Sequence, residues 1–419
     1  MCKLFRLLAL STSCILLAGL LAACSGGTDT SSAPEDASSA ADSSSTTSKD
    51  DSSSNSSDAE TPFEKSLAVA GANGRIASVM KKAQEGKPIV LGVIGGSITA
   101  GASADAGKAY ADLVTAWWKE KFPGVTFMPV NAGIGATDSI YGAHRAQNDL
   151  LGKNPDFVIV EFSVNDRGGT NTQEAYEGLM RQILQSKNTP GVLALALCGR
   201  DGSTWQDKHE PICENYQIPM ISFKDAYYAE VSSGKDPSKT LDTVWADAEH
   251  PTTMGHQMIA DLIIEYLEGV YASLDNPEEA VTELADPVTA NGYENANIYT
   301  SQTLQASSNA GWTVSGTNWM STTPNASIKF DVTGGYITMY YKRTVNVDKA
   351  GKVKVVIDGD TANAVTVDSS FAGGWGDYYA SIDLLHDSEA GAHTVEIIFD
   401  ESSAAGSEFV ISNMCVANS

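Results

Sequence analysis

Residues 90–101 read VLGVIGGSITAG, and the fold that we predict for the chain follows from this stretch. Its first half is an unbroken apolar run, which is typical of a strand that is buried on both faces. The run ends in Gly95 and Gly96, so we expect a tight turn there, with Ser97 on the turn. In an open parallel sheet, ligands bind beyond the carboxyl ends of the strands. The position of Ser97 is therefore that of a candidate nucleophile.

Three other glycine motifs do not fit this stretch. A phosphate-binding loop needs a lysine after its second glycine, and Ala102 stands at that position. The dinucleotide fingerprint G-x-G-x-x-G does not occur in it, and the nucleophile elbow G-x-S-x-G fails at Thr99. A structural turn with an unreactive serine is the remaining alternative. The rest of the chain has to decide between this alternative and a nucleophilic Ser97.

Length and charge narrow the class of protein. The chain has 419 residues, which favours two domains, and 42% of them are hydrophobic, which is enough for a sizeable core. The formal net charge of −25 comes from 27 basic and 52 acidic residues. This charge argues against nucleic acid and against anionic membrane surfaces as partners.

The first 60 residues are typical of export and tethering. Lys3 and Arg6 precede an apolar run over 7–23, so residues 1–24 are predicted to be a signal peptide. Residues 21–24, LAAC, are similar to a bacterial lipobox, in which Cys24 becomes lipidated. An ordinary secretion signal and a short membrane anchor are the alternatives. Residues 25–60 are rich in Ser, Thr, Ala and Asp and are predicted to form a disordered tether.

These features predict a location. We expect the protein at the extracellular face of a bacterial cell envelope, anchored through the lipid on Cys24, or secreted. Three further cysteines remain in the mature chain besides Cys24, and because three is an odd number at least one thiol has no partner within a monomer. Cys198 and Cys213 could form a disulfide, and buried free thiols are the alternative for Cys198, Cys213 and Cys415.

Residues 61–275 alternate between strand and helix patterns, which predicts a parallel sheet between two layers of helices. The expected strands are 89–94, 125–130, 157–162, 192–197 and 220–222. The expected helices are 64–83, 110–122, 139–151, 173–185, 208–216 and 252–272.

Residues 285–419 carry no helical period. Short strand patterns separated by glycine and Asp-Gly turns predict an all-β sandwich. The expected strands are 327–332, 336–343, 352–357, 364–367, 378–384, 393–399 and 408–416. The predicted fold class is thus an α/β domain followed by an all-β domain.

Polar residues at four points of the α/β domain together suit ester hydrolysis. Ser97 needs a base to take its proton, and His250 is a suitable one. Asp247, three residues earlier, is placed to orient that imidazole. The backbone N–H groups of Ser97 and Ala136, with the side-chain amide of Asn165, could bind an oxyanion.

Each of these signals is weak alone, because an isolated Asn-Asp or D-x-x-H is usually structural. Rival bases would be His144, His209 and His256, and none of them stands in the same context of an Asp, a Pro and a following helix. No cluster of His, Cys and Asp has metal-binding spacing, so we expect neither a metal nor another cofactor.

The same blocks resemble the SGNH, or GDSL-type, hydrolase family in their order and spacing. They are GGSI at 95–98, NAGIGA at 131–136, SVND at 163–166 and DAEHP at 247–251. The resemblance implies a flavodoxin-like, three-layer α/β/α fold and serine esterase chemistry without a metal. Gly96 replaces the family's usual Asp, as in a Gly-Gly-Ser variant among carbohydrate esterases. Ala136 stands where the family commonly has Gly.

The second domain resembles, loosely, the jelly-roll modules that accompany some polysaccharide deacetylases. Trp375, in the loop 373–376, is the candidate for stacking on a sugar ring, although most aromatic residues of such a domain are core residues.

The leading hypothesis is a surface-anchored serine esterase that removes O-acetyl groups from a polysaccharide such as xylan or mannan. A deacetylase of peptidoglycan or another envelope glycan, or a lipase or thioesterase, is the alternative enzyme. A ligand-binding lipoprotein is the alternative without catalysis.

Overall fold

The computed structural model describes residues 60–418, except for residues 168, 169 and 375. The expectations for the signal peptide, for Cys24 and for Trp375 concern residues outside this range. All but the last residue of the predicted tether also lie outside it.

The α/β domain is built on a six-stranded sheet in the order β1-β6-β5-β4-β2-β3. Five strands are parallel, and β1 pairs antiparallel with β6 at one edge. The buried apolar runs of the sequence form the central strands, as predicted. The strands are β1 (Leu67–Val69), β2 (Ile89–Gly95), β3 (Phe127–Gly133), β4 (Phe157–Glu161), β5 (Gly191–Ala196) and β6 (Met220–Ser222).

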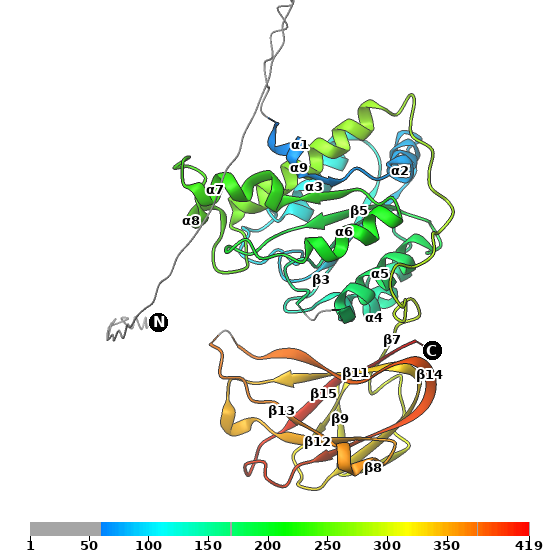
Figure 1. The fold of residues 1–419 in the computed structure, drawn as a ribbon, viewed down its shortest axis with the longest axis vertical. Coiled ribbons are helices and arrows are strands. Elements are labelled where there is room, and N and C mark those ends of the chain that lie inside the picture. The colour runs from blue at the N-terminus through cyan, green and yellow to red at the C-terminus, as the bar shows by residue number, and fades with distance from the viewer. Residues whose placement is uncertain (1–59, 168–169, 375, 419) are drawn as a thin grey trace, which may run out of the picture. The chain divides into compact units, whose positions relative to one another are not determined.

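Helices cover both faces of this sheet (Figure 1). Alternate residues of β4 show this, because Phe157 and Ile159 pack into one core and Val158 and Val160 into the other. The first core is covered by α2 (Gly74–Gln84), α3 (Tyr110–Lys121) and α9 (Thr253–Ala272). The second core is covered by α4 (Ser139–Asp149), α5 (Thr170–Leu184) and α6 (Gln206–Asn215). The predicted three-layer α/β/α fold is confirmed. Among the described helices, none combines the length and the apolar character that crossing a bilayer requires.

The continuous helix predicted over 64–83 is wrong. The structure has α1 (Pro62–Ser66), then β1, then α2. Gly71 lies between β1 and α2 at φ +58°, and a Cβ there would come within 2.3 Å of Pro219 N. Close packing on the chain before β6 therefore interrupts the helix. Short elements that were not predicted follow β6: a π-helical turn (Lys224–Tyr228), α7 (Ala229–Ser233) and α8 (Leu241–Val244).

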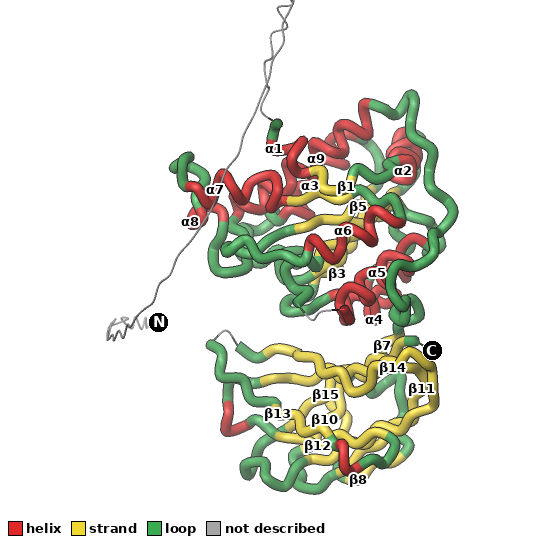
Figure 2. The backbone as a smooth tube through the Cα atoms, viewed as in Figure 1, coloured by secondary structure: helices red, strands yellow, loops and turns green. Residues whose placement is uncertain are grey.

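The second domain is an antiparallel β-sandwich, as predicted (Figure 2). Its two longest strands, β11 (Ser327–Arg343) and β14 (Tyr378–Phe399), pair with each other over most of their length, with two shifts of register. One half of this pair is extended by β8 (Ser308–Ala310), β12 (Lys352–Ile357) and β13 (Val365–Asp368). The other half is extended by β7 (Asn297–Tyr299), β9 (Thr313–Ser315), β10 (Asn318–Ser321) and β15 (Phe409–Ala417).

The turn that we predicted within the residues of β11 is wrong. Gly334 and Gly335 were expected to form a turn between two strands, but β11 continues through them with a shift of register. A Cβ on Gly335 would lie 2.3 Å from the carbonyl oxygen of Asp387. These glycines therefore serve close approach of two strands and not a reversal of the chain. Residues 378–399 were likewise predicted to form two strands, and they form the single strand β14.

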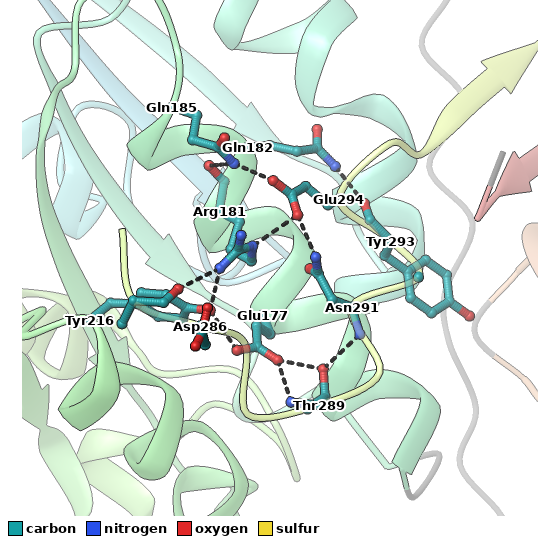
Figure 3. A network of polar contacts seen from close by, with 12 residues as sticks. Glu177, Arg181, Gln182, Gln185, Tyr216, Asp286, Thr289, Asn291, Tyr293 and Glu294 are labelled. Carbon is teal, nitrogen blue, oxygen red and sulfur yellow. Dashed lines mark hydrogen bonds and ion pairs between the residues drawn. The ribbon is translucent and has the colours of Figure 1, made fainter. Parts of the chain in front are cut away.

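A buried carboxylate fastens the segment between the two domains to α5 (Figure 3). Glu177 accepts hydrogen bonds from the backbone N–H groups of Val288 and Thr289, both at 2.7 Å, and from the Tyr216 hydroxyl, also at 2.7 Å. One turn further along α5, Arg181 pairs with Glu294 at 2.9 Å. This segment is therefore packed against α5 by specific contacts and does not behave as a free linker.

Candidate active site

Ser97 lies directly after β2, at the carboxyl edge of the parallel sheet. The chain turns sharply there, with the Ala100 N–H donating to the Gly96 carbonyl and the Ala102 N–H donating to the Ser97 carbonyl. The two glycines before Ser97 allow close contacts: a Cβ on Gly95 would lie 2.2 Å from Thr99 Oγ1. The turn therefore holds Ser97, which is partly exposed, above a tightly packed floor.

The loop that carries Asp247 and His250 is held by a single carboxylate. Asp247 Oδ1 accepts from the backbone N–H groups of Glu249 and His250, at 2.9 and 2.8 Å. The Ala246 N–H donates to the His250 carbonyl at 2.8 Å and closes the loop. Thr252 then caps α9 by accepting from Gly255 N. One oxygen of Asp247 is thus occupied by the turn, which leaves Oδ2 for the imidazole.

Ser97, His250 and Asp247 form one hydrogen-bonded line. The distance from His250 Nδ1 to Asp247 Oδ2 is 2.8 Å, and that from His250 Nε2 to Ser97 Oγ is 2.8 Å. A carboxylate at Nδ1 places the imidazole proton there, so Nε2 accepts the Ser97 hydroxyl proton. Burial raises the pKa of Asp247, but hydrogen bonds from the side chain and backbone of His250 and from Glu249 N outweigh it and lower the pKa below its ordinary value. Asp247 is therefore a carboxylate over the range in which His250 would act.

The turn after β3 lies beside Ser97. A Cβ on Gly135 would be 3.7 Å from the Ser97 Cβ. Ala136 adopts φ +57°, a left-handed conformation that suits glycine, although it carries a Cβ. Among the described residues, neither the Ala136 N–H nor the Ser97 N–H donates a hydrogen bond to another group. The turn that carries Ala136, one predicted oxyanion donor, thus lies beside Ser97, the predicted nucleophile and second donor.

Asn165 reaches the same place from the loop after β4. Its Oδ1 is buried without a hydrogen-bond partner in the described part of the chain, whereas its Nδ2 is accessible and donates to no described group. A Cβ on Gly96 would lie 2.2 Å from Oδ1. The absence of a side chain at Gly96 therefore leaves the space that Asn165 occupies, and Asn165 Nδ2 remains free to donate.

A buried network below the site was not predicted. Asp166, next to Asn165, accepts from the backbone N–H of Ser139 at 2.8 Å and from its hydroxyl, and it pairs with His209 Nε2 at 2.8 Å. The His209 ring is stacked on Tyr176 with centroids 3.6 Å apart. Ser139 opens α4 directly after the turn that carries Ala136. Asp166 therefore ties the two predicted oxyanion segments together.

Arg145 is a second residue that the sequence did not reveal. It is buried, and its guanidinium donates to the carbonyls of Ala132 at 2.6 Å and Gly95 at 3.0 Å. It therefore joins the carboxyl ends of β3 and β2. No sequence signal marks this role, because a single arginine in an amphipathic helix is usually exposed.

Glu161, the last residue of β4, gives a pH-dependent prediction. Burial, with the nearby charge of Asp166, raises its pKa from 4.5 to about 7. Between these pH values the folded state binds more protons than the unfolded state, so the free energy of unfolding falls as the pH rises. Glu161→Gln removes this titration. We expect the free energy of unfolding of the variant, measured relative to that of the wild type, to rise by on the order of 1–3 kcal/mol between about pH 5 and about pH 8.

Denaturant unfolding of both proteins at the two pH values measures this gain. A difference in stability that is the same at both values would show that Glu161 ionises in the folded protein as it does in the unfolded chain. The hydroxyls that contact Glu161, those of Thr99 and Ser163, can rotate to accept from an amide, so the substitution is conservative.

The rival bases are all placed elsewhere. His144 binds the Ile140 carbonyl, and burial lowers its pKa to about 4. His209 is paired with Asp166, and His256 lies between the Tyr110 N–H and the Ala102 carbonyl.

Cys198, Cys213 and Cys415 are buried free thiols, so the possible Cys198–Cys213 disulfide does not form. Within residues 60–418, leaving out 168, 169 and 375, no cluster of three or more His, Cys, Asp or Glu residues could hold a metal ion.

The arrangement is that of a serine hydrolase. A serine, a histidine and an aspartate lie in line at the carboxyl edge of a parallel sheet, and free N–H donors lie beside them. The known relatives agree with this class. The profile of the GDSL-like lipase/acylhydrolase family matches residues 93–258, and no curated protein matches the chain.

Two solved structures of a two-domain esterase (CEX) active on acetylated mannans are similar to this chain over both domains. One of them was co-crystallized with mannopentaose. Each is 30% identical in sequence, over 85% of this chain and 98% of that chain, with TM-scores of 0.79 and 0.80. The chain belongs to the GDSL-like lipase/acylhydrolase family, as the four sequence blocks predicted, and it is a carboxylic-ester hydrolase.

Proposed function

We propose that this protein is a carbohydrate esterase that removes O-acetyl groups from a polysaccharide, with acetylated mannan as the first candidate and acetylated xylan as the second. The observation that carries the proposal is the 2.8 Å contact between Ser97 Oγ and His250 Nε2 in a chain that shares both domains with esterases active on acetylated mannans.

The geometry supports a two-step mechanism. Ser97 Oγ attacks the acetyl carbonyl carbon while its proton passes to His250 Nε2, and Asp247 stabilises the imidazolium. The N–H groups of Ser97 and Ala136 and the amide of Asn165 bind the negative oxygen of the tetrahedral intermediate. The C–O bond to the sugar then breaks, and the sugar hydroxyl leaves with the proton from His250.

Water completes the cycle. His250 takes a proton from a water molecule, which attacks the acetyl-Ser97 ester. The second tetrahedral intermediate expels Ser97 Oγ, and the proton on His250 returns to it. The products are acetate and free enzyme. Every step uses side chains and backbone N–H groups of this chain, and water.

Acetate release from a panel of acetylated mannan, xylan, pectin and peptidoglycan tests the proposal, together with aryl esters of increasing acyl length. We expect acetate from mannan or xylan, and a rate on aryl esters that falls steeply beyond acetyl. Release from peptidoglycan alone would move the role to the cell's own wall. A preference for long acyl chains would contradict the proposal and favour a lipase or thioesterase.

The location proposed for the enzyme is the outer face of a bacterial envelope, anchored by a lipid on Cys24. The support is the signal-like sequence of residues 1–24, which precedes the polar residues 25–60. In cells that express the full chain, we expect Cys24→Ser to move the esterase activity from the membrane fraction to the soluble fraction. Activity that stays in the membrane fraction would argue for another kind of anchor.

A further inference from the structure

A second depression opens beside the site at the carboxyl edge of the sheet. Its volume is about 480 Å³, within the range of pockets that hold small ligands. We call it the Trp205 depression. Its walls come from the loops after three neighbouring strands, β4, β5 and β6, and they include Val164, Arg167, Asp201, Ser203, Trp205 and Lys224.

The Trp205 depression borders the loop that carries two of the proposed catalytic residues, Asp247 and His250. Val164 lies next to Asn165 in the chain. Arg167 Nη2 makes an ion pair at 2.6 Å with Glu249, in the loop between Asp247 and His250. On the other side, the Arg200 N–H donates at 2.9 Å to the Ala248 carbonyl of the same loop. A chain-like substrate whose ester lies at Ser97 would therefore have its neighbouring units beside this depression.

The side chains of the depression suit a neutral, hydroxyl-rich ligand. Trp205 offers a partly exposed aromatic surface, against which the C–H face of a sugar ring can pack. Lys224 makes no ion pair with any described residue. One oxygen of Asp201 accepts a hydrogen bond from the Ser203 N–H of its own loop. These opposite charges can donate to and accept from hydroxyls, which makes short, strong hydrogen bonds.

The lining disfavours other ligands. Apart from Val164, Gly202 and Trp205, the lining residues are polar or charged, which favours a ligand with hydroxyl groups over a fatty acyl chain. The lining has two carboxylates, Asp166 and Asp201, beside its two cations, so it does not suit a polyanion. We propose that the Trp205 depression is a glycan subsite that binds a sugar unit adjacent to the unit that carries the acetyl group. This assignment rests on the proposed function.

The test compares a substrate that reaches the depression with one that does not. The ratio of kcat/KM for acetylated manno-oligosaccharides to kcat/KM for an aryl acetate would be measured in Trp205→Ala and Lys224→Met. We expect this ratio to fall about tenfold in each variant, through a higher KM for the oligosaccharide, because an aromatic contact or a charged hydrogen bond is lost. In the wild type, kcat/KM should rise with oligosaccharide length, and the variants should lose most of that rise.

Two further variants make the result decisive. Lys235→Met, which removes an exposed lysine outside the depression, should leave the ratio at the wild-type value. Trp205→Leu also removes the aromatic ring but keeps a large apolar side chain, and it replaces Trp205→Ala if that protein does not fold, which the aryl acetate rate reports. A ratio within twofold of wild type in both depression variants overturns the subsite. A wild type that releases acetate from aryl acetate but from no glycan overturns the proposed function, and the subsite with it.

Discussion

Ser97→Ala should lower kcat for aryl acetate hydrolysis by at least about 10⁴-fold while leaving the protein folded. The Ser97 hydroxyl is partly exposed to solvent and has a base, His250 Nε2, at 2.8 Å. Its removal leaves the oxyanion donors and the general base in place, so a small residual rate is expected. The free energy of unfolding should change by less than about 1 kcal/mol, because the lost hydrogen bond is partly exposed.

Initial rates and denaturant unfolding of the same preparation separate the two effects. Ser232→Ala, on the exposed surface of α7, is a matched control that should keep the wild-type rate. In the wild type, a phosphonate ester should label one serine, and peptide mapping should locate it at Ser97. Labelling elsewhere, or a variant that retains a tenth of the activity, would remove Ser97 from the mechanism.

The parts of the site that could be predicted are those encoded by short spacing. Asp247 and His250 lie three residues apart, and the turn between them is closed by the same Asp247 carboxylate that orients the ring. That geometry follows from local chain stiffness, so a motif was enough to indicate it. The contact of His250 with Ser97 spans 153 residues, and it was predicted from the chemistry of the residue types and from the resemblance of the sequence blocks to the SGNH family, because the loop of His250 follows no strand directly.

The parts that could not be predicted depend on partners distant in sequence. Asp166 meets Ser139 and His209 over separations of 27 and 43 residues, and neither partner stands in a recognisable motif. Side chains of this kind are chosen by packing, and a single sequence does not show which buried polar groups will pair.

The same reasoning applies to the fold. The central strands were predicted because they are buried on both faces and read as apolar runs. The edge strand β3 was predicted to start two residues and to end three residues too early, since its polar Asn131 and exposed Met128 disguise the pairing with β2. The helix predicted over 64–83 failed because pairing with β6, a tertiary contact, outweighed the helical pattern of residues 67–69.

Gly96→Ala tests how the position before the nucleophile controls Asn165. The added Cβ would stand 2.2 Å from Asn165 Oδ1, a distance at which one of the two must move. The Gly96 backbone is held by the turn at Ser97, so we expect the amide to be displaced and its Nδ2 to leave the oxyanion position. Loss of one such donor lowers kcat by about 10²–10³-fold, with KM changed much less.

A double-mutant cycle shows whether this loss passes through Asn165. Asn165→Ala alone should lower kcat by a similar factor, and the added Cβ then meets no amide, so Gly96→Ala combined with Asn165→Ala should be no slower than either single variant. Gly269→Ala is the matched control, because a Cβ at that position of α9 has no atom within 4 Å and should leave the rate unchanged. If the two losses multiply instead, the alanine disturbs Ser97 directly. If Gly96→Ala keeps the wild-type rate, the amide does not depend on the absence of a Cβ, and the reason for glycine at this position lies elsewhere.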